Sequence, residues 1–210
     1  MLSSKETNPQ IVATQIRIRT KAEQLFGHYG FAKTSVSDIA RACDMSTGNI
    51  YRFYRNKQAI GLAVVENFLD QQHGKMLDAR HAPRKSAETR LRAAITAGVA
   101  HLVETMAGKP RIFEMAEFLC DDPEGDVLVD NQRMFLRDAF AGLIAEGIET
   151  GEFSACDPTR QGWTLLLATS AFWMPQALVA WHRQDAIMSD LDIVLSLILT
   201  GMKSPNRQTA

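Results

Sequence analysis

The amino-acid sequence predicts an all-α protein of about nine helices, with three helices grouped near the N-terminus and a larger helical part after them. Three observations support this prediction. Apolar residues recur every three to four positions through most of the 210 residues, and no stretch shows the alternation of a strand or the turn signal of a hairpin. Short segments rich in glycine, proline and aspartate separate the helical stretches, and 46% hydrophobic content provides a sizeable core.

The first two predicted helices have recognisable ends. An apolar stripe runs along residues 11–29, and Gly30 follows as a C-cap, because glycine readily adopts the left-handed conformation that ends helices. Ser35 followed by Asp38 is a capping-box pattern, so we expect a short second helix to begin there.

The third predicted helix follows a tight turn at Asp44–Met45. Ser46 is placed to cap it, and its buried side is expected to hold Ile50 and Phe53. The stretch from Ser46 to Lys57, STGNIYRFYRNK, carries three aromatic and three basic side chains in twelve residues. So many long side chains on one short helix indicate that its outer face meets a partner surface.

The rest of the chain predicts longer helices. The fourth covers residues 57–82 and ends at Pro83, since proline cannot continue a helix. Pro175 is expected to kink the 157–182 helix. The further helices are expected at 86–108, 110–120, 125–150, 157–182 and 186–202. The predicted domains are 1–56, 57–203 and a flexible tail, 204–210.

Charge divides the chain into two unequal parts. Residues 1–57 hold nine Lys or Arg against four acids, a net charge of +5. The remaining residues hold 14 basic and 20 acidic side chains, a net charge of −6. A basic N-terminal part on an acidic body indicates that this part binds a polyanion, with random surface variation as the alternative.

Composition argues against several functional classes. The cysteines Cys43, Cys120 and Cys156 are dispersed and odd in number, as expected of packing residues in a reducing compartment. The sequence lacks a long apolar run or a signal peptide, so we expect a cytoplasmic protein. It also lacks a nucleophile elbow and a phosphate-binding glycine loop, and nothing near His101 and Glu104 completes a metal site. We therefore expect no catalytic activity, metal or cofactor.

Three helices with a tight turn between the second and third form a helix-turn-helix arrangement, whose third helix enters the major groove of double-stranded DNA. Gly48 lacks a side chain, so the helix can approach the DNA closely, and Lys57 opposes the dipole of the fourth helix unless a phosphate binds there. Core packing is the alternative for Tyr51 and Tyr54, and for Tyr54 it stays open. Base contacts are expected from Thr47, Asn49 and Arg52, and phosphate contacts from Tyr51, Tyr54 and Lys57. The predicted DNA-binding residues are Ser35, Val36, Ser37, Thr47, Gly48, Asn49, Tyr51, Arg52, Tyr54 and Lys57.

Many of these positions follow a fixed spacing over about 45 residues. They are Leu25-Phe26, Gly30, Thr34-Ser35-Val36, Asp38-Ile39-Ala40, Ser46-x-Gly48, Tyr51-x-Phe53 and Lys57. In this pattern the sequence resembles the N-terminal DNA-binding region of the tetracycline-repressor-like (TetR) family. It departs from the family at Cys43-Asp44, where a glycine often follows the second helix, although aspartate tolerates the left-handed conformation.

The resemblance implies a homodimeric repressor that binds a palindromic operator and is released by a small-molecule effector. It also implies a C-terminal ligand-binding and dimerisation domain whose last two long helices form a four-helix bundle with a partner. An effector pocket is then expected between the 57–82, 86–108 and 157–182 helices, with ordinary core packing as the alternative. The candidate ligand-binding residues are Phe68, Gln72, Met76, His101, Phe113, Phe118, Phe140, Trp163 and Trp173. A DNA-organising or cell-division protein without an inducer is the alternative function.

Overall fold

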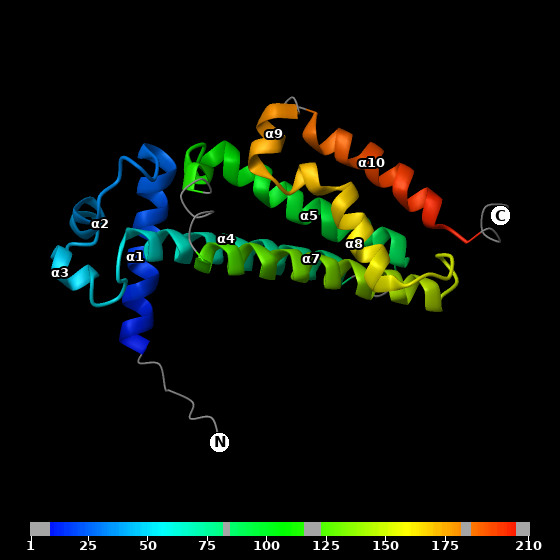
Figure 1. The fold of residues 1–210 in the computed structure, drawn as a ribbon, viewed down its shortest axis with the longest axis horizontal. Coiled ribbons are helices and arrows are strands. Elements are labelled where there is room, and N and C mark those ends of the chain that lie inside the picture. Colours follow the sequence, from blue (N-terminus) through cyan, green and yellow to red (C-terminus); the bar gives the residue numbers. More distant parts are fainter. Residues whose placement is uncertain (1–8, 82–84, 116–122, 182–185, 205–210) are drawn as a thin grey trace, which may run out of the picture. The chain divides into compact units, whose positions relative to one another are not determined.

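A computed structural model describes residues 9–81, 85–115, 123–181 and 186–204 of the chain (Figure 1). These residues form nine α-helices and two short 3₁₀-helices, and they contain no β-strand beyond an isolated bridge between Phe153 and Lys203. The all-α prediction is therefore confirmed. The chain divides into two compact units, the first built from residues up to 68 together with 105–127, and the second from 69–104 and from 128 onward.

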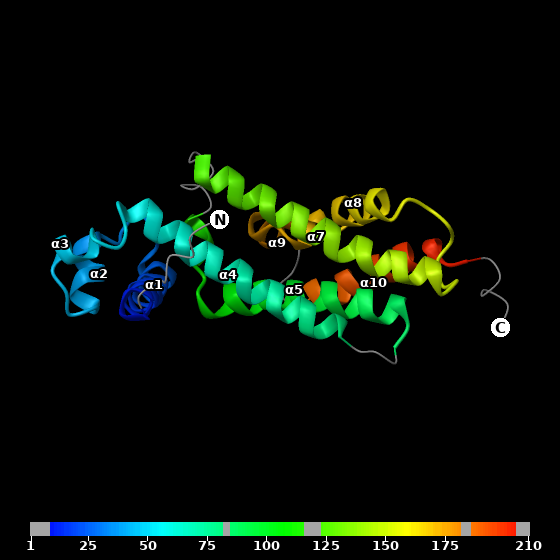
Figure 2. The same ribbon diagram turned by 90° about the horizontal axis from the view of Figure 1, so that it is seen from below.

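The first unit contains α1 (Pro9–Tyr29), α2 (Val36–Ala42), α3 (Thr47–Ile50) and the start of α4 (Lys57–Arg80). Figures 1 and 2 both show α1, α2 and α3 grouped beside the beginning of α4. The expected ends of α1 and α2 are confirmed, because Gly30 has a φ of 87° and Ser35 forms a complete capping box with Asp38.

Helix α3 is shorter than expected. Its α-helical part ends at Ile50, which is fully buried, and Phe53 is only half-buried. The backbone tightens after Ile50, because the Phe53 N–H donates to the Ile50 carbonyl at 2.9 Å, three residues back. Residues 51–53 therefore form a turn that brings the chain quickly to α4.

A second segment of the first unit packs on α1. After α5 (Ala87–Gly108), the 3₁₀-helix η1 (Ile112–Glu114) contacts α1, and Lys109 forms an ion pair with Glu23. The rings of Phe68 and Phe113 meet edge to face with centroids 5.5 Å apart. Of the expected 110–120 helix, the structure shows η1, while residues 116–120 lie outside the described residues.

The second unit holds the later helices and the second half of α4. Its further elements are α7 (Pro123–Glu149), which begins in the first unit, α8 (Pro158–Ala168), η2 (Ser170–Phe172), α9 (Pro175–Trp181) and α10 (Ile187–Met202). Apolar side chains from α5, α7, α8 and α10 form its core, among them Leu91, Ile95, Phe140, Leu143, Leu165, Leu195 and Leu199.

The predicted continuous helix over 157–182 is wrong. Helix α8 ends at Ala168, and α9 begins at Pro175. Proline has no N–H to continue a helix and disfavours helical backbone at the preceding residue, so the break lies before Pro175 and replaces the expected kink. The Thr169 hydroxyl also donates to the Leu165 carbonyl at 2.8 Å, where the helix stops.

Candidate nucleic-acid interface

The turn between α2 and α3 has the tight geometry of a helix-turn-helix. Asp44 adopts a left-handed conformation with a φ of 53°, and the Met45 N–H donates to the Ala40 carbonyl at 2.9 Å. The Ser46 hydroxyl caps α3 by accepting from the Asn49 N–H at 3.2 Å. Asp44 thus takes the place of the glycine common in the TetR pattern.

The outer side of α3 and the turn after it is open. A Cβ atom built on Gly48 would find no atom of the described residues within 4 Å. Tyr51 and Arg52 are exposed, and Thr47 and Asn49 are half-buried. Since nothing inside the protein requires a glycine here, the absence of a side chain matters only for a molecule that approaches from outside.

The first residues of α2 lie next to this surface. The hydroxyl groups of Ser37 and Thr47 are 3.5 Å apart, which joins α2 to α3. Ser35 is committed to the capping box, because its hydroxyl donates to the Asp38 carboxylate at 2.6 Å and accepts from the Asp38 N–H at 3.1 Å. The hydroxyl and the backbone N–H of Ser35, which donates to the same carboxylate at 3.0 Å, hold the pKa of Asp38 below its usual value. Val36 begins α2 and is half-buried.

Two basic side chains stand exposed in this region without an ion-pair partner among the described residues. They are Arg52, after α3, and Lys33, in the turn between α1 and α2. Two other arginines are engaged, since Arg41 pairs with Asp38 at 3.1 Å and Arg55 pairs with Glu124 at 2.7 Å. Lys33 was missed by the sequence reasoning, although its basic side chain next to the Thr34-Ser35-Val36 motif was a usable signal.

The prediction that Tyr54 reaches a phosphate needs correction. Its hydroxyl donates to the Gln15 carbonyl of α1 at 3.3 Å, and the side chain is half-buried. Burial raises the pKa of the Tyr54 phenol. Tyr54 therefore packs inward, which was the alternative expectation, whereas Tyr51 is 51% exposed and faces solvent.

The prediction for Lys57 also needs correction. Its ammonium group donates to the carbonyls of Phe31 and Thr34 at 2.9 and 3.2 Å and lies 4.4 Å above the centre of the Phe31 ring. Burial lowers the pKa of this amine. Lys57 therefore fastens the turn between α1 and α2 to the start of α4, because buried carbonyl oxygens need hydrogen-bond donors.

The structure brings four of the candidate ligand-binding residues together in the second unit. Gln72 and Met76 of α4 and Trp173 meet at Gly98 of α5, and the ring of Phe140 lies 6.1 Å from that of Trp173. The space expected for a pocket at Gly98 is filled by these side chains. His101 is buried on α5.

The remaining candidates lie elsewhere. Phe68 and Phe113 contact each other in the first unit. Trp163 is 36% exposed and lines an open hollow of about 320 Å³ on the surface of α7 and α8. Phe118 lies outside the described residues. Trp163 does not face inward with Trp173, because the helix expected to carry both is broken.

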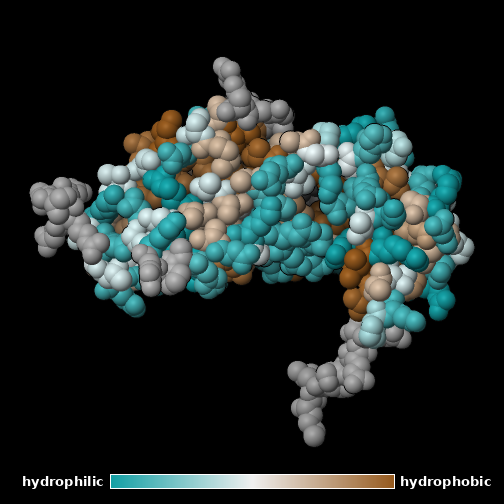
Figure 3. Space-filling view, turned by 180° about the vertical axis from the view of Figure 1, so that it is seen from behind, coloured by the Kyte–Doolittle hydropathy of each residue, from teal (hydrophilic) through white to brown (hydrophobic). Residues whose placement is uncertain are grey.

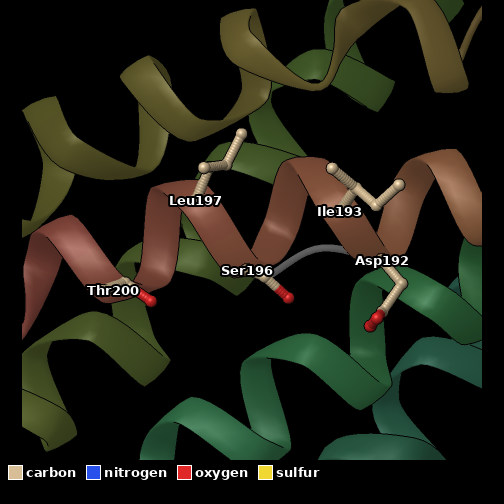
Figure 4. Close-up of a pocket in the computed structure, with 5 residues that line it drawn as sticks. All are labelled: Asp192, Ile193, Ser196, Leu197 and Thr200. Atoms are coloured by element: carbon tan, nitrogen blue, oxygen red, sulfur yellow. The ribbon is translucent and has the colours of Figure 1, made fainter.

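Helix α10 presents an apolar outer face. Ile193 and Leu197 are 58% and 73% exposed. Figure 3 shows hydrophobic side chains gathered in the region of α10. In Figure 4, these two side chains point to one side of the helix, away from Asp192, Ser196 and Thr200, with which they line a hollow of about 390 Å³. Arg92 of α5 holds the polar side by donating to Asp192 at 2.5 Å and to Ser196 at 3.2 Å.

Among the described residues, no helix is both long and apolar enough to cross a bilayer. Within the same residues, no three His, Cys, Asp or Glu side chains are grouped so that they could hold a metal ion.

Comparison with known proteins matches both parts of the sequence. Residues 18–64 match the model of bacterial regulatory proteins of the tetR family, and residues 87–194 match a tetracyclin repressor-like C-terminal domain. The second match alone spans just over half of the chain.

Individual relatives agree with these matches. An uncharacterized HTH-type transcriptional regulator of Bacillus subtilis, YezE, is 23% identical over 85% of this chain and 92% of its own length. The HTH-type transcriptional repressor KstR2 of Rhodococcus jostii is 24% identical, with 88% and 89% covered.

Solved structures share the fold. A TetR/AcrR-family regulator from Thermobifida fusca has a TM-score of 0.66 and 22% identity, covering 90% of this chain and 98% of that one. A putative transcriptional regulator from Pseudomonas aeruginosa has a TM-score of 0.71 and 16% identity, with 93% and 94% covered. With the helix-turn-helix geometry and both family matches, the chain belongs to the tetR family of bacterial regulatory proteins.

Proposed function

We propose that the chain is a homodimeric transcriptional repressor that binds a palindromic operator and releases it when a small-molecule effector binds. The observation that carries this proposal is the open, glycine-bearing face of α3 on a helix-turn-helix with a basic surround. The relative from Rhodococcus jostii is named a repressor, which supports repression over activation.

In this proposal α3 enters the major groove. Thr47, Asn49 and Arg52 contact base edges, and the missing side chain of Gly48 lets the backbone come close. Tyr51 and Lys33 have exposed polar ends long enough to reach phosphate oxygens. The DNA-binding domain comprises residues 1–56, and Lys57 and Tyr54 support it from within.

The dimer is proposed to form through α8 and α10. Trp163 and Leu167 of α8 and Ile193 and Leu197 of α10 expose apolar side chains on helices whose other faces are buried. Pairing two such helices from each subunit makes a four-helix bundle and removes well over about 1,000 Å² from water, as in obligate homodimers. Two α3 helices then meet half-sites about 34–36 Å apart, or somewhat farther.

The effector is proposed to bind within the second unit, in the domain of residues 57–203. Two structural relatives are titled a ketosteroid transcriptional regulator and a fatty acid degradation regulator, so apolar effectors are a reasonable first class to test. Helix α4 begins at Lys57 beside the DNA-binding helices and extends to Arg80, so an effector that contacts its second half has a continuous element to act on.

A DNA-organising protein without an inducer is the second candidate. The filled space around Gly98, where Gln72, Met76 and Trp173 meet, favours this alternative. The two functions differ in the number of sites they occupy, because a repressor binds a few operators, whereas an organising protein binds many positions along a chromosome.

Operator binding can be tested with DNA from beside the coding sequence of the protein. Fluorescence anisotropy with labelled duplexes at fixed salt should show tight binding to one segment and at least about 10³-fold weaker binding to a scrambled duplex. Equal affinity for both duplexes would contradict a sequence-specific repressor. Mapping bound sites across the genome then separates the repressor from the organising protein.

A further inference from the structure

A chain of hydrogen bonds, buried at Gln72 and part-buried at Gln132 and His73, joins three helices of the second unit. The Gln72 amide of α4 donates to the Gly98 carbonyl of α5 at 2.9 Å, and the Gln132 amide of α7 donates to Gln72 Oε1 at 2.9 Å. Gln132 Oε1 in turn meets His73 Nε2 of α4, so the bond directions agree when His73 carries a proton on Nε2. The His73 ring stacks on Phe135 with centroids 3.5 Å apart.

An amide in this position is costly unless its polar atoms have partners. Gln72 is 2% exposed, so a leucine or methionine would pack there without the cost of removing an amide from water. Its amide nitrogen has a second N–H, and its oxygen has a second lone pair, beyond the two bonds described. Gln72 therefore has hydrogen-bonding capacity left for an additional uncharged polar group.

The apolar side of this site is closed by Trp173. A Cβ atom at Gly98 would lie 2.8 Å from Met76 Sδ and 2.8 Å from the indole atoms Cη2 and Cζ3 of Trp173. The indole thus lies directly against the backbone of α5, next to the carbonyl that Gln72 binds. The absence of a side chain at Gly98 is what makes room for it.

Trp173 is held by an irregular segment and not by a helix interior. It follows η2 in the break between α8 and α9, it is half-buried, and the next residue, Met174, is 54% exposed. Its Nε1 donates one hydrogen bond, to Thr169 Oγ1 at 3.1 Å. The segment between α8 and α9 lacks the regular hydrogen bonds of a helix interior, so a local rearrangement of this segment that turns the Trp173 side chain outward costs less than one within a helix.

We propose that Trp173 plugs the effector site, and that the effector is an uncharged, flat, largely apolar molecule that displaces the indole and hydrogen-bonds to Gln72. The partner of the Gln72 amide is then a carbonyl, amide or hydroxyl group of the effector. The inference that this effector controls operator affinity rests on the proposed function, whereas the inference that the molecule binds at Gln72 does not.

The test uses two probes with the same ring, phenylacetamide and phenylacetate, which differ in charge at pH 8 and do not themselves emit in the tryptophan range. Binding is measured by thermal shift and by the wavelength of tryptophan emission in the full-length protein, and operator binding is measured separately. The amide should bind at least about tenfold more tightly than the carboxylate, as expected when a buried site provides hydrogen bonds but no countercharge. Its binding should move the emission to longer wavelength, because the Trp173 indole enters water.

Variants separate the plug from the polar contact. Trp173→Phe leaves a smaller plug and should strengthen amide binding while removing the emission change. Gln72→Leu should abolish the preference for the amide. Met174→Ala, a change at the exposed residue next to Trp173, is the matched control and should alter neither.

The outcomes are distinct. Stronger binding of the carboxylate, an unchanged preference in Gln72→Leu, or no thermal shift with either probe in the wild type and in Trp173→Phe would overturn the inference. Selective amide binding that leaves operator affinity unchanged would uphold the site and overturn its regulatory role. Absence of operator binding in every protein would refute the proposed function, and the thermal shifts would still decide the site.

Discussion

Replacing Lys57 by methionine separates a structural role for this lysine from a phosphate contact. Methionine keeps much of the length and apolar character of the side chain but cannot donate to the Phe31 and Thr34 carbonyls, which the ammonium group binds at 2.9 and 3.2 Å. Thr34 is 3% exposed and Phe31 is 2% exposed, so water replaces these donors poorly. The turn that leads into α2 should loosen as a result.

The expected loss follows from these two hydrogen bonds. Hydrogen bonds to charged groups contribute about 1.5–3 kcal/mol, and relief from burying the amine offsets part of this, so we expect a loss of about 2 kcal/mol. For a protein of this size, that loss lowers Tm by about 4–8 °C at constant protein concentration. Operator affinity should fall as well, because α2 and the helix that it supports lose their fixed position.

Salt dependence distinguishes the two roles. Each phosphate contact contributes about 0.9 to the slope of log affinity against log salt concentration. Lys57→Met should leave this slope unchanged, whereas Lys33→Met, which removes a proposed phosphate contact, should reduce its steepness by about 0.9. Lys33→Met is the matched control for stability, since Lys33 is an exposed lysine of the same turn and its loss should change unfolding by no more than about 0.5 kcal/mol. A slope reduced by about 0.9 with an unchanged Tm in Lys57→Met would refute the structural role.

Three further predictions concern other parts of the chain. Gly48→Ala should keep or raise stability but weaken operator binding at least about tenfold, the size of one lost base contact. Gly61→Ala is the contrast, because a Cβ there would lie 3.0 Å from Phe31 and should lower Tm. Equal operator affinity for wild type and Gly48→Ala would exclude a close approach of the α3 backbone to DNA. Sedimentation of the wild type should show twice the 23.3 kDa subunit mass, and Leu197→Glu should shift it toward the monomer; a monomeric wild type would exclude the α10 bundle. Ser35→Ala should lower Tm above pH 5, and the difference should begin to shrink as pH falls below about 4, because the hydrogen bond from the Ser35 hydroxyl lowers the pKa of Asp38 in the folded state and its stabilisation is lost as that carboxylate is protonated. The part of the difference that comes from the bond of the Asp38 N–H to the Ser35 hydroxyl should remain; a difference independent of pH would contradict this reading of the capping box.

The local rules of helix formation carried much of the fold prediction. Gly30 and the Ser35–Asp38 capping box mark helix ends through their own backbone and side-chain chemistry, so the sequence alone located them. The break after α8 was harder to locate. Pro175 signalled an irregularity in the sequence, but only the structure shows that the helix stops at Ala168 and that the Trp173 indole then packs against Gly98.

The candidate DNA-binding residues likewise include some whose surroundings a sequence can predict and some whose contacts only the folded chain shows. Exposure at Gly48 agrees with the helix periodicity that the sequence shows, whereas Tyr51 and Arg52 are exposed in the turn after α3. The hydrogen bonds of Lys57 and Tyr54 join residues 23–39 positions apart, and no spacing rule predicts such pairs. Among the candidate ligand-binding residues, Gln72 lies at a buried contact whose partners, Gly98 and Gln132, are known only from the folded chain.

Selection of binding sites from a random pool of duplex DNA tests the central claim most directly. Sequencing the DNA retained by the full-length protein should reveal a palindrome whose half-sites are separated by about one helical turn or somewhat more. The selected duplex should bind at least about 10³-fold more tightly than its scrambled counterpart at the same salt concentration. Retained DNA without a shared motif, bound as tightly as scrambled duplexes, would contradict a sequence-reading repressor.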